Sequence, residues 1–290
     1  MAYPDVHHRS VVITGCSTGI GLASARLLRA SGWTVVTTAR KPEDLERLRA
    51  EGFMAVALDV ADAVSVERAA PELIAACGGK VGALVNNAGF GQVGAMEDLS
   101  RAAIDYQFAV NVVGLQDLTN RLVPVMRGQG YGRIVNISSV LGRVSLPFMG
   151  VYSASKFALE GISDAMRIEL AGSGIAVVLV EPGPIATAFR ENVAARGHAT
   201  LDPAQVRHAD YYRREIQRRA EQNKHPGAFT AGPEAVAVKI RHALESRRPK
   251  TRYKVTFPAY LGAFMARFAP DWMIDAMMAA QVGTKKAASR

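Results

Sequence analysis

The sequence predicts a doubly wound α/β fold, in which about seven parallel strands are covered by helices on both faces. The first observation is that short, β-branched apolar runs alternate with segments of helical length along most of the chain. The second is that most of these runs are continuously apolar, as expected of strands buried on both faces. Repeated β–α units of this kind form parallel sheets with right-handed crossovers. The chain has 290 residues, 49% of them hydrophobic, which suits one large domain over residues 1–290.

The expected elements follow one another regularly as far as residue 187. Long helices are indicated in 104–126 and 151–172, where apolar residues recur at helical spacing. The strands are expected at 10–14, 34–39, 54–60, 83–87, 133–138 and 176–181, and a seventh follows at 252–256.

Two segments do not follow this alternation. Residues 188–230 are basic, rich in helix formers and without a strand candidate, and we expect them to cover the substrate pocket. Residues 257–282 carry aromatic and methionine residues near helical spacing, with Pro258 and Pro270 as breaks, and predict a C-terminal helical extension. The favoured interpretation is a helix packed on the domain or on a second subunit. A weak membrane-surface contact and a substrate lid are the alternatives.

The net charge of +9 is concentrated in one region, since residues 190–254 hold 15 Lys or Arg against 7 Asp or Glu. A basic segment can bind nucleic acid, an anionic membrane or an anionic ligand. We favour a solvated helical face and expect no nucleic-acid partner, because aromatic and basic residues are not interleaved there.

Cysteine content and hydropathy indicate the compartment. Cys16 and Cys77 are the only cysteines, so a disulfide framework is not expected. The sequence has no run of about 18 uncharged apolar residues, and its start lacks the pattern of a signal peptide. We therefore expect a cytoplasmic protein, and we predict no metal site.

A glycine-rich turn follows the first strand. The stretch TGCSTGIG at 14–21 leads into a helical pattern, the context in which backbone amides and a helix N-terminus hold a phosphate. Gly15 would permit the tight turn, Gly19 the close approach of a pyrophosphate, and Gly21 close helix packing. This pattern predicts a Rossmann-type dinucleotide site.

The second strand indicates which dinucleotide binds. A site for NAD usually carries an acidic residue at the tip of this strand, where it bonds the ribose hydroxyls. Here the strand ends in Thr38, Ala39, Arg40 and Lys41, and Arg40 can pair with a 2′-phosphate. The sequence therefore favours NADP(H) over NAD(H). Asp59 comes too late for the ribose and suits an adenine contact.

Tyr152 and Lys156 are separated by one helical turn and therefore share a face. An ammonium group near a phenol favours the phenolate and lowers the pKa of the phenol toward neutral pH. The pair is therefore a candidate acid–base catalyst.

Four further features complete the pattern: NNAG at 86–89, Asn111, Ser139 and PGPIAT at 182–187. Together with the motifs above, they resemble the short-chain dehydrogenase/reductase family over roughly residues 9–187. The stretch SASKFALEG, the GCSTG loop and the extended C-terminal region are similar to the estradiol- and retinol-dehydrogenase branch.

The resemblance implies homo-oligomers formed through the two long helices, and it implies that four residues are catalytic. Tyr152 would exchange the proton, and Lys156 would lower the pKa of Tyr152 and bind the nicotinamide ribose. Ser139 would bond the substrate oxygen, with Ser138 as its rival, and Asn111 would hold a water that connects Lys156 to solvent.

The resemblance also implies the cofactor contacts. The residues expected around the phosphates, adenine and its ribose are Gly15, Ser17, Thr18, Gly19, Ile20, Gly21, Arg40, Asp59, Val60, Asn87, Ala88 and Gly89. Those expected around the nicotinamide are Tyr152, Lys156, Pro182, Gly183, Ile185 and Thr187.

The substrate is expected between Ser139 and Tyr152 and under the segment after Thr187. Leu141, Leu146 and Phe148 make this loop apolar, which favours a hydrophobic ketone or alcohol of steroid, retinoid, aromatic or aliphatic type. The alternative function is a non-catalytic dinucleotide sensor or scaffold on the same fold.

Overall fold

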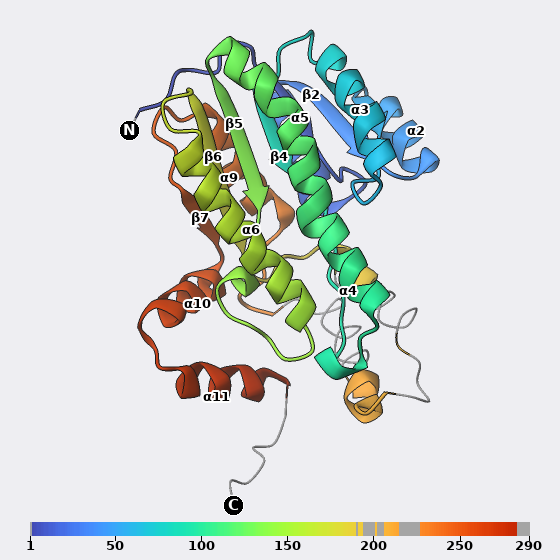
Figure 1. The fold of residues 1–290 in the computed structure, drawn as a ribbon, viewed down its shortest axis with the longest axis vertical. Helices are drawn as coiled ribbons and strands as arrows, with labels where there is room; N and C mark the ends of the chain where they lie inside the picture. The colour runs from blue at the N-terminus through green and yellow to red at the C-terminus, as the bar shows by residue number, and fades with distance from the viewer. Residues whose placement is uncertain (1, 190, 194–200, 202–205, 215–226, 283–290) are drawn as a thin grey trace, which may run out of the picture.

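The computed structural model describes residues 2–189, 191–193, 201, 206–214 and 227–282 (Figure 1). It confirms the parallel sheet of seven strands, in the order β3-β2-β1-β4-β5-β6-β7. β1 pairs with β2 on one side and with β4 on the other, so the strand order reverses at β1. Ligands of such sheets bind outside the carboxyl ends of the strands near this reversal. The strands are β1 (Ser10–Ile13), β2 (Thr34–Ala39), β3 (Met54–Ala57), β4 (Ala83–Asn86), β5 (Gly132–Ile137), β6 (Ile175–Pro182) and β7 (Arg252–Val255).

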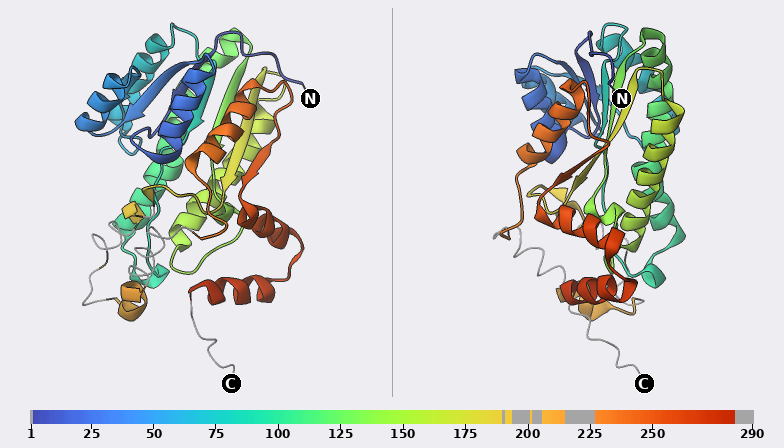
Figure 2. Two further views of the ribbon diagram at one scale, coloured as in Figure 1. Left: turned by 180° about the vertical axis from the view of Figure 1, so that it is seen from behind. Right: turned by 90° about the vertical axis from the view of Figure 1, so that its left-hand side faces the viewer.

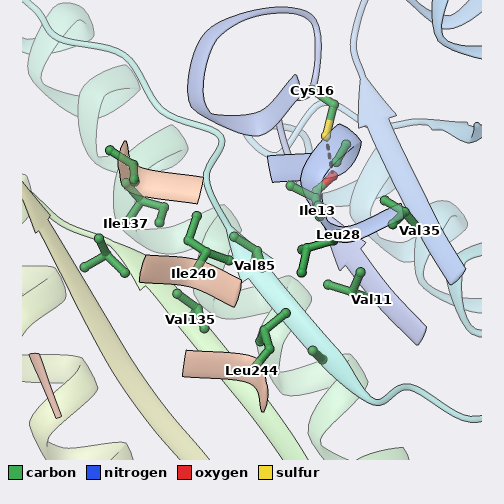
Figure 3. Packing of buried hydrophobic residues seen from close by; sticks show 14 of the residues in the cluster. Val11, Ile13, Cys16, Leu28, Val35, Val85, Val135, Ile137, Ile240 and Leu244 are labelled. Carbon is green, nitrogen blue, oxygen red and sulfur yellow. Dashed lines mark hydrogen bonds between the residues drawn. The ribbon is translucent and has the colours of Figure 1, made fainter. Parts of the chain in front are cut away.

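Helices cover both faces of the sheet, as predicted. Alternate residues of β1 enter different cores: Val11 and Ile13 lie in one, and Val12 lies in the other. Figure 3 shows the first core, where Leu28 and Ile240 pack over the strands. This core is covered by α1 (Gly19–Ala30), α2 (Pro42–Ala50) and α9 (Pro233–Glu245), and the second by α3 (Ala63–Ala76), α5 (Gly114–Gln129) and α6 (Gly150–Glu169).

Two predicted elements differ from the structure in ways that affect the site. The helix expected over 104–126 is three pieces: α4 (Arg101–Phe108), a π-helical turn η2 (Ala109–Val113) and α5. The strand expected over 54–60 ends at Ala57, so Asp59 and Val60 lie in the loop beyond the carboxyl end of β3.

The C-terminal extension consists of α10 (Phe257–Phe268) and α11 (Asp271–Val282), at the end of the sheet to which the β5 arrow points (Figure 1). Pro258 does not break α10. It lies in the first turn, where a missing N–H removes no helical hydrogen bond. Pro270 does separate the two helices. Among the helices in the described part of the chain, none combines the length and apolar composition needed to span a bilayer.

Candidate active site

A cavity of about 1020 Å³ lies at the carboxyl ends of the strands. Its wall brings together the glycine turn, the tips of β2 and β4, the loops after β3, β5 and β6, and the start of α6. It contains every predicted cofactor residue except Gly21, and three of the four predicted catalytic residues. The predicted residues in the wall are Gly15, Ser17, Thr18, Gly19, Ile20, Arg40, Asp59, Val60, Asn87, Ala88, Gly89, Ser139, Leu141, Leu146, Tyr152, Lys156, Pro182, Gly183, Ile185 and Thr187.

The glycine turn leaves no room for larger side chains. Gly15 has a φ of +70°, and a Cβ there would lie 2.8 Å from Ala88 Cα. Gly21 is outside the cavity wall because it packs inward, where a Cβ would lie 2.3 Å from Gly15 O. The turn delivers the chain to the N-terminus of α1, whose first turn holds no acid and whose N-cap, Thr18, makes no side-chain capping bond. The amides at this helix start are therefore suited to an anion.

Thr14, which the sequence interpretation did not single out, fixes the turn against β4. Its Oγ1 accepts hydrogen bonds from Asn87 N at 3.0 Å and from Ala88 N at 2.9 Å. Asn87 Nδ2 in turn donates to Thr14 O at 2.8 Å and Gly15 O at 2.9 Å. Asn87 therefore holds the glycine turn in place as well as facing the cavity. A hydroxyl residue directly before the turn is the sequence signal that could have identified Thr14.

Arg40, at the tip of β2, lies in the cavity wall at the end where the sequence predicts the adenosine. Its side chain is 58% exposed, and Nη1 lies 3.0 Å from Tyr106 Oη and 3.7 Å from Asp59 Oδ2. Lys41 lies beside it in the cavity wall. The orientation of the Asp59 side chain is fixed within its own loop, because its Oδ1 accepts a hydrogen bond from Ala61 N at 3.0 Å. The wall here thus combines two cations, Arg40 and Lys41, with two acids, Asp44 and Asp59.

Ser139, Tyr152 and Lys156 converge on the opposite part of the wall. All three are buried, and the latter two lie one turn apart near the start of α6. Lys156 Nζ lies 5.8 Å from the centre of the Tyr152 ring and donates to Ile137 O at 2.8 Å. Ser139 Oγ accepts a bond from Leu141 N at 3.1 Å.

Burial acts on both titrating groups. It raises the pKa of Tyr152 to about 12, and the hydrogen bond with Ser139 opposes this rise. It lowers the pKa of Lys156 to about 8, against the attraction of Glu160. The chain's own residues therefore move the pKa of Tyr152 opposite to the direction expected from Lys156 alone. A buried tyrosine of this kind is a neutral proton donor at neutral pH.

Asn111, the fourth predicted catalytic residue, lies behind the wall, fully buried in the π-helical turn η2. Its Nδ2 donates to Phe90 O at 2.9 Å and to Ser155 Oγ at 3.1 Å, and its Oδ1 accepts from Phe90 N at 3.1 Å. Ser155 Oγ also donates to Tyr152 O at 2.7 Å. Asn111 is therefore linked to α6, the helix that carries Tyr152 and Lys156, through Ser155. The extra residue of a π turn, common at functional sites, accompanies this placement.

Ser138 lies beside Ser139 but contacts a different group. Ser138 is buried, and it acts to lower the pKa of Glu160 on α6, one turn after Lys156. The Ser139 hydroxyl is the one bonded to Tyr152. This geometry favours Ser139 over Ser138 for contact with a substrate oxygen.

Glu160 belongs to a buried ion-pair network that the sequence interpretation missed. Arg143 Nη2 lies 3.2 Å from Glu160 Oε2 and 2.9 Å from Glu181 Oε1. Arg252 Nε lies 3.0 Å from Glu160 Oε2 and 3.3 Å from Glu181 Oε1. Glu160 and Glu181 are 5% and 1% exposed, so their charges need these partners. The network connects the Ser139 loop, α6, β6 and β7, and it involves Arg143, the one charge of the predicted substrate loop.

The remaining wall of the cavity is apolar. Leu141 and Leu146 are joined by Met149 and Phe189, and the Phe189 ring centre lies 5.6 Å from that of Tyr152. Phe148 is not part of the wall, because its ring stacks on Tyr211 at 3.5 Å. Residues 190, 194–200, 202–205 and 215–226 of the predicted cover lie outside the described residues.

Comparison with known proteins identifies the same family that the sequence motifs resemble. The model of the family described as short chain dehydrogenase matches residues 9–197. The uncharacterized oxidoreductase YbbO of Escherichia coli K12 is 43% identical over 94% of this chain and 95% of its own length. Human retinol dehydrogenase 8 is 37% identical over 84% and 80%. The NADPH-dependent 3-dehydrocapnine reductase of Ornithobacterium rhinotracheale is 32% identical over 92% and 95%.

Solved structures with this fold hold either dinucleotide. A short chain dehydrogenase/reductase from Burkholderia phymatum in complex with NAD is 27% identical, with a TM-score of 0.73 over 100% of this chain and 99% of that one. A short chain dehydrogenase from Burkholderia cenocepacia in complex with NADP is 28% identical, with a TM-score of 0.69 over 89% and 100%.

Proposed function

The chain belongs to the short-chain dehydrogenase/reductase family, and from this premise we propose that it is an NADP(H)-dependent oxidoreductase of hydrophobic ketones and secondary alcohols. The observation that carries the proposal is the convergence of Ser139, Tyr152 and Lys156 in the wall of one cavity, opposite a glycine turn suited to a dinucleotide phosphate. An acid–base group beside a dinucleotide site is the arrangement that ketone reduction requires.

Tyr152 would transfer the proton. Its buried phenol is neutral at pH 7 and can donate to a carbonyl oxygen, while Ser139 donates a second hydrogen bond to the same oxygen. As negative charge develops on that oxygen, the nearby Lys156 ammonium stabilises the tyrosinate left behind. In alcohol oxidation the same groups act in reverse.

The residues present fit a nicotinamide dinucleotide. The turn at Gly15 and Gly21 is closed to any side chain, which leaves the backbone amides at the start of α1 for a pyrophosphate. Asp59 and Val60 border the adenine end, and Pro182 to Thr187 border the end next to Tyr152. When bound there, the nicotinamide would supply or accept the hydride.

Arg40 supports a preference for NADP(H). It stands half-exposed at the tip of β2 with Lys41 beside it, where a 2′-phosphate could form charge-assisted bonds to both. The change Arg40→Asp should weaken NADPH binding and shift the preference toward NADH. The measurement is the ratio of kcat/KM values for the two cofactors, and an unchanged ratio would show that Arg40 does not set the cofactor preference.

The change Tyr152→Phe tests the function itself. We expect turnover of bulky ketones to fall about 10²- to 10⁴-fold, as is typical when a general acid is removed, while NADPH binding followed by fluorescence stays nearly intact. Tyr131→Phe is the matched control, because Tyr131 is equally buried but precedes β5 at the opposite end of the strand. Full turnover in Tyr152→Phe would contradict the proposal and revive the non-catalytic dinucleotide sensor.

A further inference from the structure

Helix α10 exposes a continuous apolar face. The buried side of the helix is formed by Ala259, Gly262 and Met265, which fix its orientation on the domain. The opposite side carries large apolar side chains at the helical spacing i, i+3, i+4, i+7 and i+11. These are Phe257 (58% exposed), Tyr260 (56%), Leu261 (38%), Phe264 (60%) and Phe268 (70%), and we call them the aromatic face.

Neighbouring residues extend this surface. Phe229 is 59% exposed and its ring centre lies 5.4 Å from that of Phe257. Trp272, 69% exposed, follows at the start of α11. Single exposed apolar residues are ordinary, whereas a contiguous patch of this kind indicates a contact surface.

The aromatic face adjoins the cavity. Leu261 belongs to both, and Pro258 and Gly262 of α10 line the cavity with Met277 and Met278 of α11. Figure 2 shows both helices at the outer end of the domain, beyond the sheet. An apolar molecule lying against the aromatic face would therefore reach the cavity over an apolar wall.

The basic residues next to the aromatic face come from β7 and α10, and the two acids of α11 equal them in number. Lys254 Nζ lies 5.9 Å from the Tyr260 ring centre, and Arg267 is exposed in the last turn of α10. α10 contains no acid, whereas α11 adds Asp271 and Asp275. The chain as a whole carries +9, which opposes the approach of a second copy and favours an anionic partner. Aromatic side chains next to Lys and Arg are the composition of segments that lie in a bilayer interface.

We propose that the aromatic face docks this protein on anionic lipid bilayers, with the cavity opening toward the membrane. α10 lies in the interface plane, its aromatic side chains enter the headgroup region, and Lys254 and Arg267 contact lipid phosphates. The link between docking and substrate rests on the proposed function, because hydrophobic ketones partition into bilayers. Vesicle binding itself is measured without turnover, so the two proposals can fail separately.

The two tryptophans provide the readout. Trp33 is 4% exposed, whereas Trp272 is 69% exposed and follows Phe268 of the aromatic face by four residues. Vesicles of phosphatidylglycerol and phosphatidylcholine should shift the fluorescence to the blue in the wild type and leave Trp272→Phe unchanged. The shift should disappear at high salt and with phosphatidylcholine alone. Asp275→Asn should strengthen binding about fivefold, since one charge near a lipid surface contributes about 1 kcal/mol.

The double variant Phe264→Glu/Phe268→Glu should weaken vesicle binding by at least about tenfold, because two apolar side chains no longer enter the interface. Both side chains are mainly exposed, so the fold should tolerate the change. Val238→Glu, on the exposed side of α9, is the matched control and should bind like the wild type. Turnover of a water-soluble ketone should be unchanged in both variants, which separates docking from catalysis.

Two results would overturn the inference. The first is absence of vesicle binding by the wild-type protein at low salt. The second is a wild type that self-associates in sedimentation, a double variant that is monomeric, and no difference between them with vesicles. In that case the aromatic face is an interface between two copies of the chain.

Discussion

Replacing Lys156 by methionine should stabilise the fold at neutral pH, although it removes a proposed catalytic residue. The Lys156 side chain is 6% exposed, and burial lowers its pKa from 10.5 to about 8. The folded state therefore carries an ammonium that would be better solvated in the unfolded chain. Methionine has a similar length and no charge to desolvate.

The magnitude follows from the pKa. A fall from 10.5 to about 8 corresponds to about 3 kcal/mol of destabilisation by the charged lysine. The hydrogen bond from Nζ to Ile137 O is also lost in the variant, which offsets about 1 kcal/mol. We therefore expect Lys156→Met to be more stable than the wild type by about 2 kcal/mol at pH 7.

The sign of the pH dependence is fixed by the same shift. Between about pH 8 and 10.5 the folded state binds fewer protons at Lys156 than the unfolded state, so wild-type stability gains with rising pH and the advantage of the variant shrinks. Burial also raises the pKa of Cys77 to about 11 and that of Cys16 to about 12, which lowers stability above pH 9. Both cysteines are present in both proteins, so the difference between the proteins isolates Lys156.

The assay is urea unfolding of both proteins at pH 7, 8, 9 and 9.5, with Lys80→Met as an exposed-lysine control. A variant that is less stable than the wild type at pH 7 would refute the reasoning. A stability difference that stays constant from pH 7 to 9.5 would do the same, because it would show that Lys156 does not lose a proton early.

Two further changes test the site and its support. Gly21→Ala should abolish tight NADPH binding in calorimetry, because the new Cβ would lie 2.3 Å from Gly15 O and displace the glycine turn; wild-type affinity would show that the turn is not the phosphate site. Glu181→Gln should lower the free energy of unfolding by about 3 kcal/mol or more, because Arg143 and Arg252 lose a buried partner. Denaturation with urea measures this loss, and a change below about 1 kcal/mol would mean that the network is solvated.

Much of the fold and site could be predicted because their signals are local. Continuous apolar runs predicted all seven strands, and their boundaries were correct to within three residues. The spacing of Tyr152 and Lys156 predicted a shared helix face, and glycines directly after a strand predicted the turn. Each of these features depends on steric or hydrophobic preferences within a few residues of the chain.

Other features needed the tertiary structure, because they depend on groups that are distant in the sequence. Nothing near Arg143 indicates that Glu160, Glu181 and Arg252 surround it, since four different segments meet there. The sequence pattern around Asn111 is that of an ordinary α-helix, whereas the structure has a π-helical turn there. In that turn the Asn111 side chain bonds to Phe90 and Ser155.

The sequence alone determined which residues form the strands, the glycine turn and the Tyr–Lys pair. Only the tertiary structure decided the pKa values of that pair and which side of α10 faces outward. The physical reason is that desolvation and side-chain exposure depend on everything packed around a group, and a linear pattern records only its neighbours along the chain.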